Sequence, residues 1–114
     1  MLTVEKLREW GAAVDEGLAR CMNEEDFYIM LVGMAVTDKK LDDLAAALDA
    51  HDLDRAFDVA HTLKGTYGDL ALTPIYAPVN EMAELLRVRT DTDYSALISE
   101  AKKQKAILEE TANA

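Results

Sequence analysis

Apolar residues recur at helical spacing along almost the whole chain, and very little interrupts them. Only five glycines and two prolines occur among 114 residues, of which half are hydrophobic. Side chains three or four positions apart share one face of an α-helix, so this spacing predicts amphipathic helices rather than strands. The length fits one domain with a single packed core. We therefore expect an all-α protein in which residues 1–114 form one domain.

Capping residues divide the chain into helices joined by short connections. Asn23, Thr37, Asp52 and Thr73 are good N-caps, and Pro74 suits a first helical position. Two short helices are expected within an N-terminal segment, 1–22, that packs on the remainder. Longer helices are expected over 24–36, 38–50, 53–71, 73–89 and from about 92 onward. Because short loops make neighbouring helices antiparallel, we predict an antiparallel up-and-down four-helix bundle with short extra N-terminal helices.

The helix predicted over residues 24–36 is apolar on every face. Such a helix is either deeply buried or presents a surface to a partner. We expect Met22, Met30, Met34 and Met82 to fill the core, since methionine adapts to irregular gaps. The residues of this helix that we expect to be exposed, and available to a partner, are Ile29 and Val32.

Charge and composition exclude several classes of partner. Twelve basic and 22 acidic residues give a net charge of −10, which repels nucleic acid and anionic membranes. No apolar run reaches 18 residues, and the first ten residues are too charged for a signal peptide. The lone Cys21 reads as a small buried hydrophobe, as is usual in a reducing compartment. We expect a cytoplasmic monomer that contacts neither nucleic acid nor membrane.

The helix predicted over residues 53–71 carries the candidate chemistry. If His61 is placed at 0° on a helical wheel, the apolar residues of this helix gather between roughly 160° and 280°. His61 lies well outside that arc, so we expect its imidazole to face solvent. Lys64, Gly65 and Gly68 follow at i+3, i+4 and i+7, and Phe57 precedes at i−4.

These neighbours suit a histidine that carries a phosphoryl group. An exposed imidazole is a nucleophile at neutral pH without strong tuning. Lys64 can offset phosphoryl charge. Each glycine weakens a helix interior by roughly 1 kcal/mol relative to alanine, so Gly65 and Gly68 must provide something else, and we predict clearance for a partner's backbone. Phe57 is expected at the edge of an exposed apolar docking patch.

The run from Ala60 to Gly65, Ala-His-Thr-Leu-Lys-Gly, resembles the signature of the histidine phosphotransfer (HPt) domain family. Residues 17–22 and 72–76 resemble stand-alone bacterial members. The resemblance implies that His61 is the phospho-acceptor, Lys64 its charge partner and Gly65 the clearance residue.

Two positions depart from the family pattern. Tyr67 stands where a small residue is usual, and Asp69 replaces an amide. Tyr67 falls in the core arc of the wheel, and Asp69 lies about 80° from His61.

The resemblance implies a phosphorelay intermediate rather than an enzyme with its own ATP site. Its partners would be response-regulator receiver domains and a hybrid histidine kinase, with Mg²⁺ on the receiver partner and no cofactor or metal on this chain. The sequence has no phosphate-binding Gly-rich motif. One alternative is a bundle that binds receivers without carrying phosphate. A second, a metal- or cofactor-holding bundle, lacks the Glu-x-x-His ligand spacing.

Overall fold

The computed structural model describes residues 1–114 and contains seven helices and no strand. The helices are α1 (Val4–Trp10), α2 (Val14–Arg20), α3 (Glu25–Thr37), α4 (Lys40–Asp49), α5 (Leu53–Asp69), α6 (Thr73–Arg87) and α7 (Ser95–Asn113). No helix is both long enough and apolar enough to cross a membrane.

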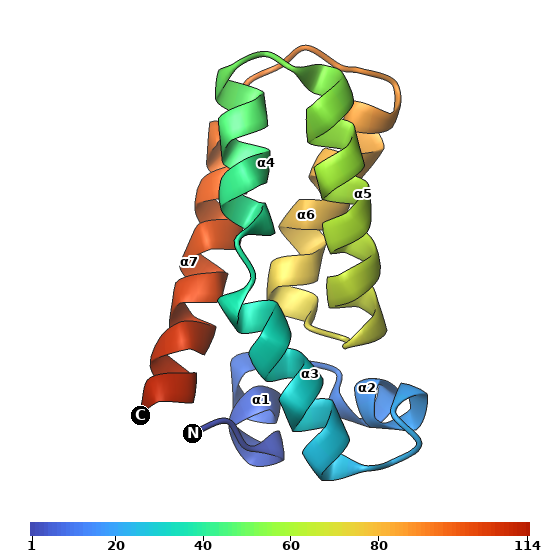
Figure 1. The fold of residues 1–114 in the computed structure, drawn as a ribbon, viewed down its shortest axis with the longest axis vertical. Helices are drawn as coiled ribbons and strands as arrows, with labels where there is room; N and C mark the ends of the chain where they lie inside the picture. The colour runs from blue at the N-terminus through green and yellow to red at the C-terminus, as the bar shows by residue number, and fades with distance from the viewer.

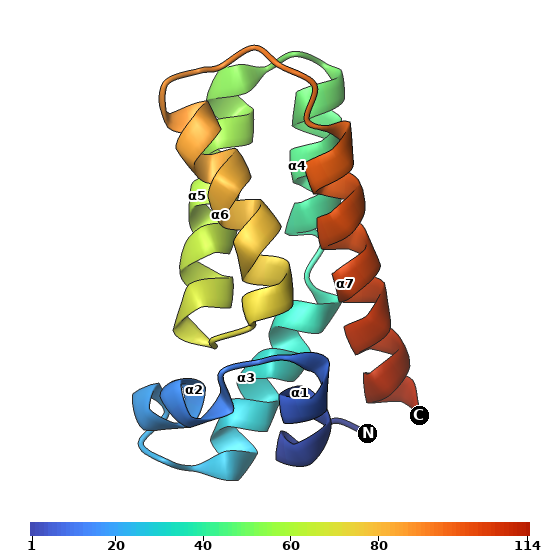
Figure 2. The ribbon, with the colours of Figure 1, turned by 180° about the vertical axis from the view of Figure 1, so that it is seen from behind.

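Helices α4–α7 form an antiparallel bundle, as predicted (Figure 1). α5 packs between α4 and α6, and α7 packs against α6 and α4. α3 continues the line of α4 after a break, and the two short helices α1 and α2 close the lower end of the bundle (Figure 2). The two short helices predicted within residues 1–22 are present as α1 and α2.

The break between α3 and α4 differs from the prediction that Thr37 caps a helix over 38–50. Thr37 is instead the last residue of α3, and its hydroxyl donates back to the carbonyls of Gly33 and Met34. The Asp38 carboxylate accepts a hydrogen bond of 2.6 Å from the Lys40 amide, so α4 begins at Lys40. The last helix also begins later than expected, at Ser95, whose amide donates to Asp93.

One continuous core joins the bundle to the N-terminal helices. The buried stripe of α5 is as predicted for Ala56, Ala60, Leu63 and Tyr67, and Cys21 is also buried. The methionine prediction holds only for Met82. Met22, Met30 and Met34 are 84%, 53% and 62% exposed, which places them on the surface.

The N-terminal segment satisfies backbone groups at the end of α5. The last carbonyls of a helix have no partner within it and must be bonded elsewhere. Arg20 donates to the carbonyls of Gly68 and Asp69 at 2.6 and 3.2 Å, and the Tyr28 hydroxyl donates to Leu70 at 2.8 Å. The backbone amide of Ala13 donates to the carbonyl of Ala71, at 2.9 Å. These bonds fix the end of the helix that carries His61.

Candidate functional site

His61 lies on the exposed face of α5, as the helical wheel predicts. The helix begins where the Asp52 carboxylate accepts a hydrogen bond from the Arg55 amide, at 3.1 Å. His61 then falls near the middle of α5, on the side of the helix away from its buried face. The imidazole makes no hydrogen bond to the rest of the chain, so both ring nitrogens are open to a partner.

Phe57 supports the His61 ring rather than standing open to solvent. The two rings stack with centroids 5.6 Å apart and an interplanar angle of 28°. The guanidinium groups of Arg89 and Arg87 lie over the Phe57 ring, at 4.7 and 5.7 Å from its centroid. The expectation of an exposed Phe57 is therefore wrong, because it is partly buried and covered by two cations. Both guanidinium groups also pair with carboxylates, Arg87 with Glu84 and Arg89 with Asp54, so the edge beside the imidazole carries paired charges.

Lys64 is held by an acidic residue of the neighbouring helix. Its ammonium group lies 2.6 Å from a carboxylate oxygen of Glu84 on α6. Arg87 approaches the same carboxylate, with both contacts at 3.3 Å. Hydrogen bonds from Lys64 and then from Arg87 lower the pKa of the Glu84 carboxyl to about 2. Glu84 is thus ionised at neutral pH and is shared by two cations.

The two glycines near His61 have different surroundings. A methyl group added at Gly65 would meet nothing within 4 Å, so this position leaves open surface next to the imidazole. A methyl group at Gly68 would lie 3.0 Å from the ring of Tyr76. The expectation that Gly68 provides clearance for a partner is therefore wrong. Its missing side chain lets α6 pack closely on α5.

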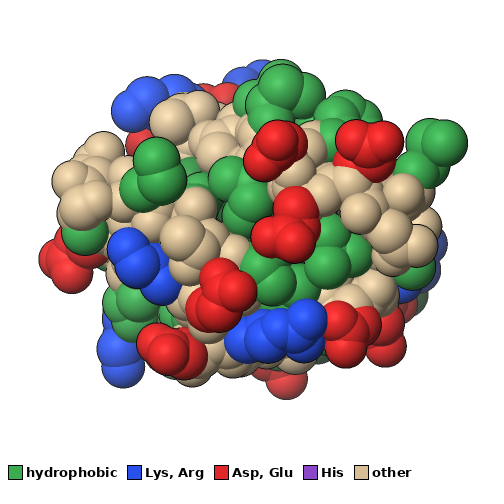
Figure 3. All heavy atoms as spheres, turned by 90° about the horizontal axis from the view of Figure 1, so that it is seen from below, with side chains coloured by type: hydrophobic (Ala, Val, Ile, Leu, Met, Phe, Trp, Pro, Cys, Tyr) green, Lys and Arg blue, Asp and Glu red, His purple; other side chains and the backbone are tan.

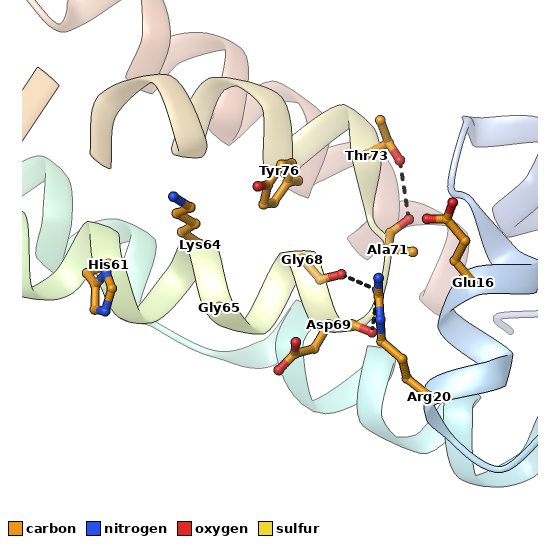
Figure 4. Close-up of a pocket in the computed structure, with 10 residues that line it drawn as sticks. All are labelled: Glu16, Arg20, His61, Lys64, Gly65, Gly68, Asp69, Ala71, Thr73 and Tyr76. Atoms are coloured by element: carbon orange, nitrogen blue, oxygen red, sulfur yellow. Dashed lines mark hydrogen bonds between the residues drawn. The ribbon is translucent and has the colours of Figure 1, made fainter. Parts of the chain in front are cut away.

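A groove runs from His61 along α5 to the N-terminal segment (Figure 4). Lys64, Gly65 and Gly68 line it from α5, Tyr76 lines it from α6, and Arg20 closes its far end. Asp69 also lines the groove and is exposed, so its charge faces solvent at the groove wall. Tyr67 is buried in the core, as the wheel predicts, and burial raises the pKa of its phenol.

The exposed face of α3 is made of different residues from those predicted. Val32 is fully buried, and Ile29 is partly buried against the core, so neither forms an open patch. Phe27, Met30 and Met34 are 44%, 53% and 62% exposed instead. Figure 3 shows this end of the molecule, where hydrophobic side chains gather among acidic ones. Because α3 is apolar on all sides, periodicity alone did not reveal which side meets the core.

Asp69 connects the α3 face to the His61 groove. Leu31 and Met34 line a second hollow together with Thr66 and Asp69 of α5. Asp69 thus belongs to the walls of both hollows. These two hollows, together with the exposed Met30 one turn before Met34 on α3, make up the α3–α5 face.

Sequence reasoning missed the residues that other segments bring to His61. Glu84, Arg87 and Arg89 lie more than 20 residues away in sequence, and Arg20 arrives from α2. The i,i+3 spacing of Glu84 and Arg87 indicates a local ion pair. Nothing in that spacing indicates that the pair faces Lys64, because this depends on how α6 packs against α5.

A family model described as Hpt domain matches residues 34–114. The chain belongs to the Hpt domain family. The match covers more than half of the chain and contains the whole α4–α7 bundle with His61, Lys64 and Gly65. It begins within α3, so α1, α2 and most of α3 lie outside it. Neither a curated protein nor a solved structure matches the chain.

Membership of the Hpt family implies a phosphotransfer role in a phosphorelay, together with interaction with receiver domains. An Hpt domain is a phosphotransfer domain and not a kinase. This agrees with a site that presents an exposed imidazole in the middle of α5.

Proposed function

We propose that His61 accepts a phosphoryl group from the aspartyl phosphate of one receiver domain and transfers it to the aspartate of another. The observation that supports this most directly is the exposed, hydrogen-bond-free imidazole in mid-helix, stacked on Phe57 and next to the open position at Gly65. Receiver domains of a hybrid histidine kinase and of a response regulator are the proposed donor and acceptor. The reaction would take place in the cytoplasm with the chain as a single domain, 1–114.

The transfer requires only groups that the chain and its partner possess. The lone pair of the unprotonated His61 nitrogen attacks phosphorus as the bond from phosphorus to the aspartyl oxygen breaks. The carboxylate leaves with that electron pair, and the ring releases its remaining N–H proton to solvent. In the onward step a carboxylate oxygen of the acceptor aspartate attacks phosphorus as the N–P bond breaks, the bonding pair returns to the ring, and the ring takes a proton from solvent. Catalysis is mostly positioning and charge stabilisation, which Lys64 supplies here and Mg²⁺ supplies on the receiver.

We propose that the receiver docks on the α3–α5 face. Gly65 lets the partner's backbone approach His61, and Met30 and Met34 offer exposed apolar contacts beyond Asp69. Methionine suits such a surface because its flexible side chain adapts to different partners. Replacing Met34 by Ala is expected to weaken receiver binding while leaving the fold intact, because this side chain is already 62% exposed.

The two histidines of the chain provide a matched experiment. The purified protein is incubated with a phosphorylated receiver, and acid-labile label on the chain is measured. His61→Gln is expected to abolish the label, whereas His51→Gln is expected to retain it. His51 is a suitable control because it is exposed in the turn before α5, 4.0 Å from Asp91. If wild-type protein binds receivers but never takes label, the alternative of a non-phosphorylated receiver-binding bundle is supported instead.

A further inference from the structure

The ion pair between Lys64 and Glu84 places the charge partner of the proposed site away from the phospho-acceptor. In Figure 4 the Lys64 side chain extends from α5 toward α6, while the His61 ring lies on another side of α5. The ammonium group is 2.6 Å from Glu84 and makes no bond to any group on α5. Lys64 must therefore leave Glu84 before it can contact a phosphoryl group on His61.

We propose that Glu84 is a positioning residue that holds the Lys64 ammonium group against α6 in the resting protein and competes with the phosphoryl group for it. This inference rests on the proposed function of His61. In this arrangement Glu84 limits how strongly His61 retains the phosphoryl group, which favours onward transfer over storage.

The geometry allows Lys64 to change partners. The Lys64 and Glu84 side chains are 26% and 48% exposed, so water screens their attraction. A phosphoryl group carries more charge than a carboxylate and has three strong acceptor oxygens. The lysine side chain has a flexible stem of four carbons, and its ammonium group has three donors. The ammonium group can therefore turn toward His61 without a movement of the backbone.

Arg87 lowers the energetic cost to Glu84 of losing Lys64 to the phosphoryl group. When Lys64 leaves, the Glu84 carboxylate still has the two 3.3 Å contacts from Arg87. The same guanidinium lies over Phe57, which stacks on His61. Glu84 therefore keeps a counter-ion in both states, and no unpaired charge is created on α6.

The test measures the equilibrium between phosphorylated receiver and phosphorylated His61. Glu84→Gln removes the competing charge and is expected to shift this equilibrium toward His61 by about two- to fivefold, the range typical of an exposed ion pair. The half-life of the phosphohistidine should lengthen in the same direction. A variant that matches wild type in both measurements would overturn the proposal.

Two further variants separate this role from a general charge effect. Glu81→Gln removes the same charge from the exposed face of α6, but Glu81 makes no contact with Lys64. It is expected to leave the equilibrium unchanged, and an effect equal to that of Glu84→Gln would contradict the proposal. In a Lys64→Gln background, Glu84→Gln should have no further effect. A persistent effect there would show that Glu84 acts without Lys64.

Failure of this inference is distinguishable from failure of the proposed function. If wild-type protein takes label but Glu84→Gln changes nothing, only the role of Glu84 is lost. If wild-type protein takes no label, His61 is not a phospho-acceptor, and both conclusions fall. Circular dichroism and thermal unfolding of each variant confirm that the fold is retained.

Discussion

At the scale of single residues, some members of the site can be predicted from the sequence and others cannot. His61, Lys64 and Gly65 lie within five residues of one helix, so their relative positions follow from helix geometry alone. Glu84 joins them only because α6 packs on α5, and no local spacing encodes that contact. The sequence therefore predicts the proposed phospho-acceptor and its neighbours on α5 but not the carboxylate that engages Lys64.

The pKa of Glu84 predicts how stability depends on pH. The carboxyl pKa falls from an ordinary 4.5 to about 2 in the folded protein, mainly through Lys64 and Arg87. A lowered folded-state pKa adds stability above pH 4.5, and this contribution is lost as the pH falls toward 2. Glu84→Gln should therefore be less stable than wild type at pH 7, and the difference should shrink as the pH falls below 4.5 and vanish only below about pH 2.

Denaturant unfolding at pH 7, 4 and 2.5 checks this expectation. Asp15 and Asp93 also have lowered pKa values, but they titrate alike in both proteins and cancel in the comparison. Glu81→Gln serves as the control and should follow the wild-type curve. A constant difference between Glu84→Gln and wild type across this range would argue against an ionised Glu84 contact.

Tyr67 carries a buried hydroxyl without a hydrogen-bond partner. Leaving such a group unsatisfied costs about 1–3 kcal/mol, so Tyr67→Phe should raise the free energy of unfolding by roughly 1 kcal/mol. Tyr28→Phe is the contrasting variant, because its hydroxyl donates to Leu70 at 2.8 Å. Urea unfolding should show opposite signs for the two changes. A loss of stability in Tyr67→Phe would indicate that its hydroxyl does have a partner in solution.

At the scale of helices, amphipathic periodicity predicted α5 and α6 well and α3 poorly. One face of α5 is polar, so its buried stripe could be read from spacing, and the structure confirms it at Ala56, Ala60 and Leu63. α3 has apolar residues all round, so the side that meets the core depends on tertiary packing. This is why Val32 was expected outside and Met30 inside, the reverse of what is found.

Replacing Gly65 by Ala tests whether the open surface at this position of α5 serves an approaching partner. Because a methyl group there meets nothing, Gly65→Ala should stabilise the helix by about 0.5–1 kcal/mol. The same methyl group would obstruct a partner at His61, so phosphoryl transfer should slow while thermal stability rises. Gly33→Ala on α3 is the stability control, since that position is also open. Equal transfer rates in Gly65→Ala and wild type would contradict the clearance role.

At the scale of the whole molecule, charge is unevenly placed. The chain carries a net charge of −10, yet Arg87 and Arg89 both lie over the Phe57 ring that stacks on His61. A local cluster of cations can attract an anionic group although the molecule as a whole is acidic. The overall charge predicted which partners to exclude, but only the fold brings Arg87 and Arg89 to the side chain that stacks on His61.

The N-terminal helices complete the bundle, although the family match begins at residue 34. Leu7, Val14, Tyr28 and Val32 are fully buried in the common core. Full burial of an apolar side chain contributes roughly 1.5–3 kcal/mol, and whole domains are stable by only about 5–15 kcal/mol. Residues 1–33 therefore supply a share of the core comparable with the net stability of the domain.

A fragment of residues 34–114 is accordingly expected to lose cooperative unfolding. It would lack those four side chains and also the bonds from Arg20 and Tyr28 to the last carbonyls of α5. Far-ultraviolet circular dichroism should still report helix, but thermal unfolding should become broad, and the fragment should bind the dye ANS. A sharp transition close to that of the full chain would mean that α4–α7 fold unaided. The N-terminal helices would then serve the groove next to His61 rather than the stability of the bundle.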